Sequence, residues 1–177
     1  MTDESLRYPI GRFSPPVEVT PTDREKYLTE IERLPSEMRN VVAGLSDEQL
    51  DIPYREGGWT IRQVVHHVPD SHVNSYIRYR WTLTENQPTI KAYYEDRWGE
   101  LPDAASAPVE PSLQLLEAIH QRWLLLLRAM SDEDYARSFV HPETNKTIRL
   151  DTMLALYAWH GKHHVAHIQN LKTRMRW

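Results

Sequence analysis

The feature that most restricts the fold is a series of helix-start signals, each followed by a stretch with helical periodicity. The signal is a Ser or Thr followed three residues later by Glu or Gln, which caps a helix from both sides; it occurs at Thr22/Glu25, Ser46/Gln49 and Thr60/Gln63. We expect helices over about 22–43, 46–53, 60–84, 112–130 and 151–174, the last capped by Asp151. No convincing strand pattern is present, so the sequence predicts an all-α four-helix bundle.

The connections between these helices are predicted to be long. Residues 1–20 contain three prolines and should form an extended N-terminal arm on the surface. Residues 54–58 should form a tight loop at Gly57 and Gly58. Residues 86–111 hold four prolines and predict a surface excursion with at most one short helix. A turn over 131–136 and a small hairpin around 141–145 complete what we expect to be a single domain over residues 1–177.

Composition excludes several classes of function. The chain has no cysteine, which rules out disulfides, thiolate nucleophiles and cysteine-ligated zinc sites. Its net charge of -4 argues against nucleic-acid binding, which needs a cationic surface. We found neither a signal-peptide pattern nor a run of apolar residues long enough to span a bilayer, so we expect a cytoplasmic protein that does not bind membranes. Any bound metal must rest on His, carboxylate or water.

The last predicted helix carries the most informative pattern. Met153, Tyr157, His160, His164 and Leu171 fall on one narrow stripe, the face that a bundle helix must bury. Because His160 and His164 are one turn apart, their imidazoles can reach one metal ion at the roughly 2 Å distances that zinc or nickel requires. The alternative is a pair of core histidines that only form hydrogen bonds. A second pair with the same spacing, His163 and His167, lies at the edge of this face.

A third ligand would have to come from another helix. The helix after Thr60 offers His66, His67 and His72, and Pro69 makes the helical phase unreliable there, so periodicity alone does not choose among them. His120 lies on an apolar face, where we expect packing or a supporting role rather than metal coordination.

Several stretches resemble the YfiT-like branch of the DinB superfamily, and the similarity spans essentially the whole chain. They are Asp51–His67, Asp70–His72, Asn74–Arg78, the terminal segment Tyr157–Ile168 and the opening Tyr8–Gly11. The resemblance implies a four-helix bundle with three histidine ligands for one divalent metal, which on this chain are His67, His160 and His164. Pro69 departs from the family pattern, where we expect a residue such as Ala.

The resemblance also implies two kinds of chemistry for this metal, Zn²⁺ in the first instance or Ni²⁺. Related proteins transfer bacillithiol, mycothiol or glutathione to small electrophiles, and members of this branch are regarded as metal-dependent hydrolases. We favour a thiol S-transferase, because a hydrolase would need a carboxylate as general base. Asp70, one turn after His67, is the nearest candidate, although a solvated surface charge or a hydrogen-bond acceptor for a ligand explains it as well.

Three further interpretations remain open at this stage. The bundle could bind metal without catalysis, as a metal-responsive or stress-response protein, or its histidines could be purely structural. Bis-histidine haem is conceivable, but no apolar pocket pattern favours it. By analogy we expect a homodimer, with a low-molecular-weight thiol and a small electrophile as partners. Arg62, Asn74 and Arg78 could contact an anionic cosubstrate, or could simply form a solvated helix face.

Overall fold

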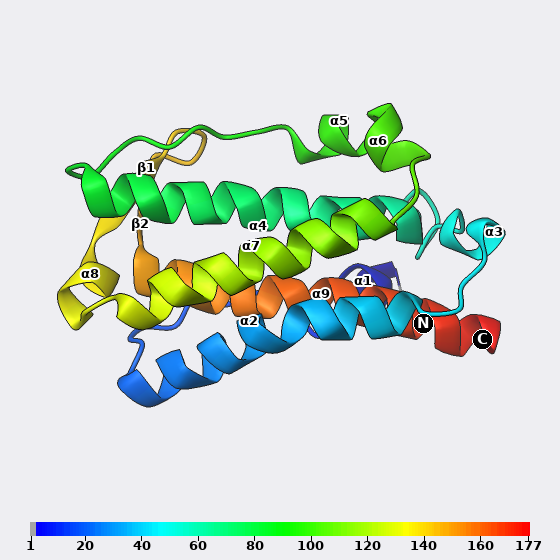
Figure 1. The fold of residues 1–177 in the computed structure, drawn as a ribbon, viewed down its shortest axis with the longest axis horizontal. Coiled ribbons are helices and arrows are strands. Elements are labelled where there is room, and N and C mark those ends of the chain that lie inside the picture. The colour runs from blue at the N-terminus through cyan, green and yellow to red at the C-terminus, as the bar shows by residue number, and fades with distance from the viewer. Residues whose placement is uncertain (1–2) are drawn as a thin grey trace.

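The computed structural model describes residues 3–177, and most of them are helical. In chain order the elements are α1 (Asp3–Arg7), α2 (Pro21–Val42), α3 (Asp47–Leu50), α4 (Ile61–Thr84), α5 (Glu95–Gly99), α6 (Pro102–Ala105), α7 (Glu110–Ala129), α8 (Asp132–Ala136), β1 (Ser138–His141), β2 (Lys146–Arg149) and α9 (Leu150–Met175). The four long helices α2, α4, α7 and α9 form a bundle, which confirms the predicted fold class (Figure 1).

The order of the helices around the bundle differs from a simple up-and-down arrangement. α2 and α4 each pack against both α7 and α9, so α2 lies diagonally opposite α4. α2 and α9 run in one direction and α4 and α7 run in the other (Figure 1). Because α4 and its neighbour α7 are parallel, the chain must return the full length of α4 between them. The segment that contains α5 and α6 makes this return along the outer side of α4.

The helix starts agree with the sequence at α3 and α4 but not at α2 and α9. Ser46 and Thr60 form the predicted capping boxes. The predicted Thr22/Glu25 box is wrong: Thr20 caps α2 with Asp23, since Pro21 fits the first helical position, where no amide donor is needed. The predicted Asp151 cap is also wrong. Arg149 occupies the cap position of α9 without a side-chain hydrogen bond, and Asp151 lies inside the first turn.

The connections contain more structure than the sequence indicated. The N-terminal arm begins with the short helix α1, the excursion after α4 holds two short helices, α5 and α6, and the predicted turn at 131–136 is the helix α8. The predicted hairpin is present as β1 and β2, paired antiparallel with Ser138 opposite Arg149 and His141 opposite Lys146. The hairpin also contacts the excursion, because the amide of Ile90 donates to the carbonyl of Val140 (3.1 Å).

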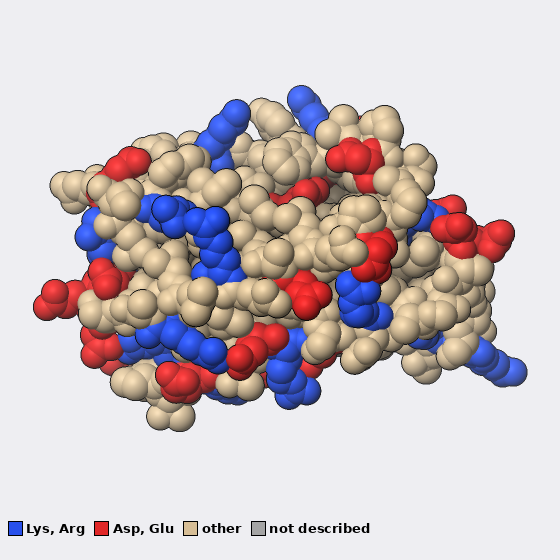
Figure 2. Space-filling view, viewed as in Figure 1, with Lys and Arg blue, Asp and Glu red and all other residues tan. Residues whose placement is uncertain are grey.

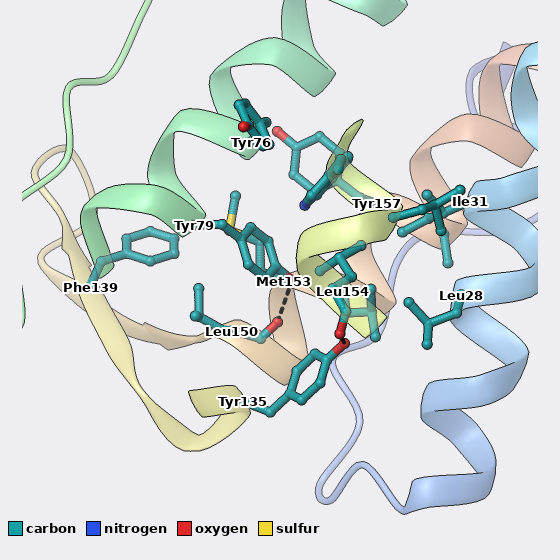
Figure 3. Close-up of a cluster of buried hydrophobic side chains, with 14 of the residues drawn as sticks. Leu28, Ile31, Tyr76, Tyr79, Tyr135, Phe139, Leu150, Met153, Leu154 and Tyr157 are labelled. Atoms are coloured by element: carbon teal, nitrogen blue, oxygen red, sulfur yellow. Dashed lines mark hydrogen bonds between the residues drawn. The ribbon is translucent and has the colours of Figure 1, made fainter. Parts of the chain in front are cut away.

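Two groups of buried apolar side chains fill the bundle. The group drawn in Figure 3 joins α2, α4, α7, α8 and α9. Within it the Tyr79 hydroxyl donates to the carbonyl of Leu150 (2.6 Å) and so ties α4 to the start of α9. The second group lies nearer the other end and contains Leu34 and Val165. Each buried Leu, Val or Ile stabilises the fold by about 1.5–3 kcal/mol relative to an exposed one.

The surface carries both signs of charge. On the face viewed in Figure 2, Lys and Arg side chains are interspersed with Asp and Glu, so neither sign forms a continuous area there. Within residues 3–177, no helix combines the length and apolar composition that crossing a bilayer requires.

Candidate metal centre

Three histidines from two antiparallel helices converge on one point. His67 comes from α4, and His160 and His164 come from α9. The Nε2 atom of His160 lies 3.3 Å from Nε2 of His67 and 3.2 Å from Nε2 of His164. One ring nitrogen from each residue can be chosen so that all three lie within 4.8 Å of one another. Three neutral imidazoles at this spacing fit one divalent ion of the zinc or nickel type.

Short-range features of the sequence help to position the three imidazoles. His160 and His164 are one turn apart, so they project side by side from α9. Gly161 lets α9 approach α2 closely, because a Cβ atom there would lie 2.4 Å from Cδ2 of Leu34. The indole of Trp59, just before α4, packs on His67 with ring centroids 4.5 Å apart. The contact at Gly161 sets how closely α9 packs on α2, and the contact with Trp59 restricts the position of the His67 ring.

A chain of hydrogen bonds runs from His160 away from this cluster into the core. The Nδ1 atom of His160 lies 3.2 Å from Nε2 of His72, and Nδ1 of His72 lies 2.8 Å from Nε2 of His120. Nδ1 of His120 then lies 2.7 Å from the carbonyl oxygen of Ile31. The chain therefore connects α9, α4, α7 and α2 in turn.

The Ile31 carbonyl can only accept, and this sets the direction of every hydrogen bond in the chain. His120 must donate from Nδ1, so its Nε2 accepts from Nδ1 of His72, and Nε2 of His72 accepts from Nδ1 of His160. Nε2 of His160 is thereby left unprotonated and faces the other two imidazoles, as a metal ligand requires. Ile31 is available because the residue four positions later is Pro35, which has no amide hydrogen to donate.

Burial keeps these histidines uncharged. It lowers the pKa of His67 and of His120 to about 4 each. The pKa values of His72, His160 and His164 also lie well below the ordinary 6.5, mainly through burial and further through neighbouring histidines. A neutral imidazole is the form that coordinates a metal.

The other histidines have different surroundings. His66, next to His67 in the sequence, lies with Nδ1 2.7 Å from Oγ of Ser112 and Nε2 3.2 Å from the carbonyl of Ala107. His163 and His167 pair with each other, their Nε2 atoms 2.9 Å apart, and burial lowers their pKa values to about 4 and about 3. In residues 3–177 the cluster on α4 and α9 is the one group of three such ligands.

The cluster opens on a cavity of about 750 Å³. His67 and His160 line it, together with polar and aromatic residues from α4, α9, the excursion after α4 and the hairpin; these include Ser71, Arg78, Tyr93, His141 and Tyr157. Its acidic members Glu95, Asp96 and Glu143 are exposed. No hydrogen bond joins any of these three carboxylates to the histidine cluster within the described part of the chain.

The structure places Asp70 away from this cavity. Asp70 is not among the residues that line it, and its pKa is raised to about 6, first by burial and then by the negative charge of Asp103 in α6. Of the polar residues that the sequence suggested for an anionic cosubstrate, Arg62 is bound by Asp51 (2.6 Å), and Asn74 donates to the backbone carbonyl of Asp70 (2.9 Å). Arg78 alone of that group lines the cavity.

Sequence reasoning did not identify the hydrogen-bond chain or the cavity residues outside the helices. The sequence did contain features that point to the chain of hydrogen bonds. Pro35 frees the Ile31 carbonyl in α2, and His120 is the polar residue on the buried face of α7. Tyr93 and His141 could not be found in this way, because the fold alone brings the excursion and the hairpin together.

Comparison with known proteins agrees with this architecture. The profile of the DinB superfamily matches residues 30–168. The chain belongs to the DinB superfamily. A Bacillus subtilis member, YfiT, is 46% identical and covers 100% of this chain and 99% of its own length. A Bacillus cereus (strain 03BB102) member is 51% identical and covers 97% of this chain and 98% of its own. Both carry the name "Putative metal-dependent hydrolase".

Two solved structures show the same fold. The structure of YfiT, described as having an unusual four-helix bundle topology, matches with a TM-score of 0.96 over 98% of this chain and 99% of that one. A mycothiol-dependent maleylpyruvate isomerase matches with a TM-score of 0.66 and 17% identity, over 82% of this chain and 60% of that chain. At that identity the second match shows a shared fold only.

Proposed function

We propose that this DinB-superfamily chain is a metal-dependent enzyme that transfers a low-molecular-weight thiol, of the bacillithiol type, to small electrophiles. The observation that carries the proposal is the convergence of three neutral imidazoles, His67, His160 and His164, beside an open cavity. A divalent ion held by them, Zn²⁺ or Ni²⁺, would keep a thiol in its nucleophilic thiolate form at neutral pH. The chain has no cysteine, so the sulfur must come with a cosubstrate.

The residues of the chain would perform three tasks in this reaction. The three imidazoles would hold the ion without neutralising its charge, because none of them is anionic. The chain of hydrogen bonds behind His160 would keep its Nε2 atom free of a proton. The cavity would admit both substrates beside the ion. A distant structural neighbour is named as mycothiol-dependent, which supports thiol chemistry on this fold.

A hydrolase is the second candidate, and the names of the close relatives favour it. It requires a group that accepts a proton from water near the ion. The carboxylates that line the cavity are exposed, and Asp70 is not among the residues that line it. We therefore favour thiol transfer.

The test compares wild type with His164→Ala and with a matched control, His66→Gln, which changes a buried histidine outside the cluster. Each protein is stripped of metal, reloaded with Zn²⁺ or Ni²⁺, and assayed for bound metal and for consumption of bacillithiol, glutathione or cysteine with an aryl halide. We expect His164→Ala to lose stoichiometric metal and at least about 100-fold in rate, since one of three ligands is missing. His66→Gln should keep both.

Three outcomes would contradict the proposal. Hydrolysis of ester or amide substrates without thiol consumption would establish the alternative enzyme. Stoichiometric metal binding, with no turnover of the thiols and aryl halide or of the ester and amide substrates, would indicate a non-catalytic binding protein. Metal binding unaffected by His164→Ala would place the ion elsewhere.

A further inference from the structure

Arg78 is a buried cation for which the described residues supply no counter-ion. Only 9% of its surface is exposed, and it lines the same cavity as His67 and His160. Its Nη2 donates one long hydrogen bond to the carbonyl of Lys91 (3.4 Å), and its Nε is buried with no hydrogen-bond partner among the described residues. In residues 3–177, no carboxylate oxygen lies within 4.0 Å of its guanidinium. A buried charge in this state is unfavourable, so a ligand that brings the opposite charge would be bound strongly.

The other arginines at this cavity differ from Arg78. Arg7 forms an ion pair with Asp3 (2.8 Å), and Arg55 lies 4.0 Å from the same residue. These two side chains therefore already have an acidic neighbour within the chain. Among the arginines that line the cavity, Arg78 is the one whose guanidinium has no acidic neighbour among the described residues.

Arg78 shares a helix face with the metal cluster. His67, Ser71 and Arg78 follow one another at spacings of four and seven residues, which places them on one stripe of α4. Arg78 comes eleven residues after His67, or about 16 Å along the helix axis. Both side chains lean toward the helix start, so the guanidinium and the imidazole are still separated by roughly 16 Å along the axis.

The surroundings of Arg78 favour a small anion at this end of the cavity. Its Cζ lies 6.0 Å from the ring centroid of Tyr93. His141, which also lines the cavity, has a buried Nδ1 atom without a hydrogen-bond partner. Glu143 lies at the same cavity, but its side chain is exposed and forms no ion pair with Arg78 among the described residues. Hydrogen-bonding capacity and positive charge are thus both available to a ligand.

We infer that Arg78 forms an anion subsite, which binds the carboxylate of an elongated ligand whose other end lies at the histidine cluster. The inference rests on the proposed function for the thiol end of that ligand and extends it to the class of substrate. A thiol with a carboxylate about 10 Å from its sulfur spans the separation within α4 once the metal bonds at one end and a hydrogen bond at the other, about 2–3 Å each, are included. The same carboxylate could instead belong to the electrophile, and the experiment separates these two sources.

The experiment uses cobalt-loaded protein and follows the sulfur-to-cobalt absorption. Three probes are titrated: 2-mercaptoethanol, 8-mercaptooctanoate and its neutral analogue 8-mercapto-1-octanol. We expect wild type to bind the carboxylate at least about tenfold more tightly than the alcohol, as for a charge-assisted hydrogen bond. Arg78→Gln should abolish this preference and leave 2-mercaptoethanol binding unchanged. Arg78→Lys should retain part of it, because the charge remains.

The matched control is Arg80→Gln, which removes a charge of the same sign from the exposed side of the same helix. It should keep the full preference. A second arm titrates octanoate by calorimetry into protein already saturated with 2-mercaptoethanol. Octanoate binding that Arg78→Gln removes, in a protein that shows no preference for the carboxylate thiol over the alcohol, would assign the carboxylate to the electrophile.

Two negative results are distinguishable. If no thiol changes the cobalt spectrum, the proposed function fails, while octanoate binding to the same protein still reports on Arg78. If thiols bind, but neither the preference for 8-mercaptooctanoate nor the binding of octanoate depends on Arg78, the anion subsite is overturned.

Discussion

His120 lies two hydrogen bonds away from His160, yet its replacement should weaken metal binding. His120→Leu removes the donor to the Ile31 carbonyl and the acceptor for His72, so nothing then fixes which nitrogen of His160 carries the proton. We expect metal affinity to fall about 10–100-fold, the usual effect of losing a group that orients a ligand. Competition with a chelating dye measures this affinity.

His120→Gln provides the rescue variant, because its amide can donate to Ile31 and accept from His72. His66→Leu is the control for burial, since His66 is also buried but bonds to Ser112 and Ala107. It should lower stability without changing metal affinity. Equal affinity of wild type and His120→Leu would show that the chain of hydrogen bonds does not orient His160.

At the scale of helices, the contact between α2 and α9 depends on Gly161. An alanine would be preferred there by about 1 kcal/mol on helix propensity. Its Cβ would however lie 2.4 Å and 2.8 Å from the two Cδ atoms of Leu34, which is buried in the core. Overpacking of a core costs about 1–3 kcal/mol, so after the gain in helix propensity we expect Gly161→Ala to lower the free energy of unfolding by up to about 2 kcal/mol. Urea denaturation of the metal-free protein measures it.

The double mutant separates this contact from other effects. In a Leu34→Ala background the crowding is absent, so Gly161→Ala should become neutral or stabilising. A destabilisation of the same size in both backgrounds would contradict the argument. The structure thus identifies a side chain of α2 as the group that requires this glycine.

For the whole molecule, buried neutral histidines make stability depend on pH. Eight histidines have pKa values below the ordinary 6.5, among them His67 and His163 at about 4 and His167 at about 3. Below pH 6.5 the unfolded chain therefore binds more protons than the folded one. The contribution of these histidines to stability is fully present above that pH and is lost as the pH falls toward 4.

Each of these histidines contributes up to about 1.4 kcal/mol per pH unit in this range. We expect the urea midpoint of metal-free protein to be clearly lower at pH 5.5 than at pH 7.5, and to stay nearly constant from pH 7.5 to 8.5. Denaturant titration at these three values is sufficient. An equal midpoint at pH 5.5 and 7.5 would mean that the histidines are not held neutral in the fold.

The amino-acid sequence by itself determined the helices and much of the candidate site. Periodicity and capping residues are local, so four long helices and the His160/His164 pair could be predicted from residues adjacent on the chain. The choice of His67 over His66 came from family resemblance, because the helical phase was uncertain at Pro69. The structure then placed His67 with the α9 pair and His66 against Ser112.

One local choice was also predicted wrongly from the sequence. Whether Thr20 or Thr22 caps α2 depends on small differences between competing local hydrogen bonds, and the structure has Thr20 at the cap.

Tertiary structure alone decided which distant groups meet. The hydrogen bond from His120 to Ile31 and the unpaired charge of Arg78 are properties of packing between elements far apart on the chain. Periodicity assigns a residue to a face, but the partner on that face is fixed only when four helices and the excursion share one core.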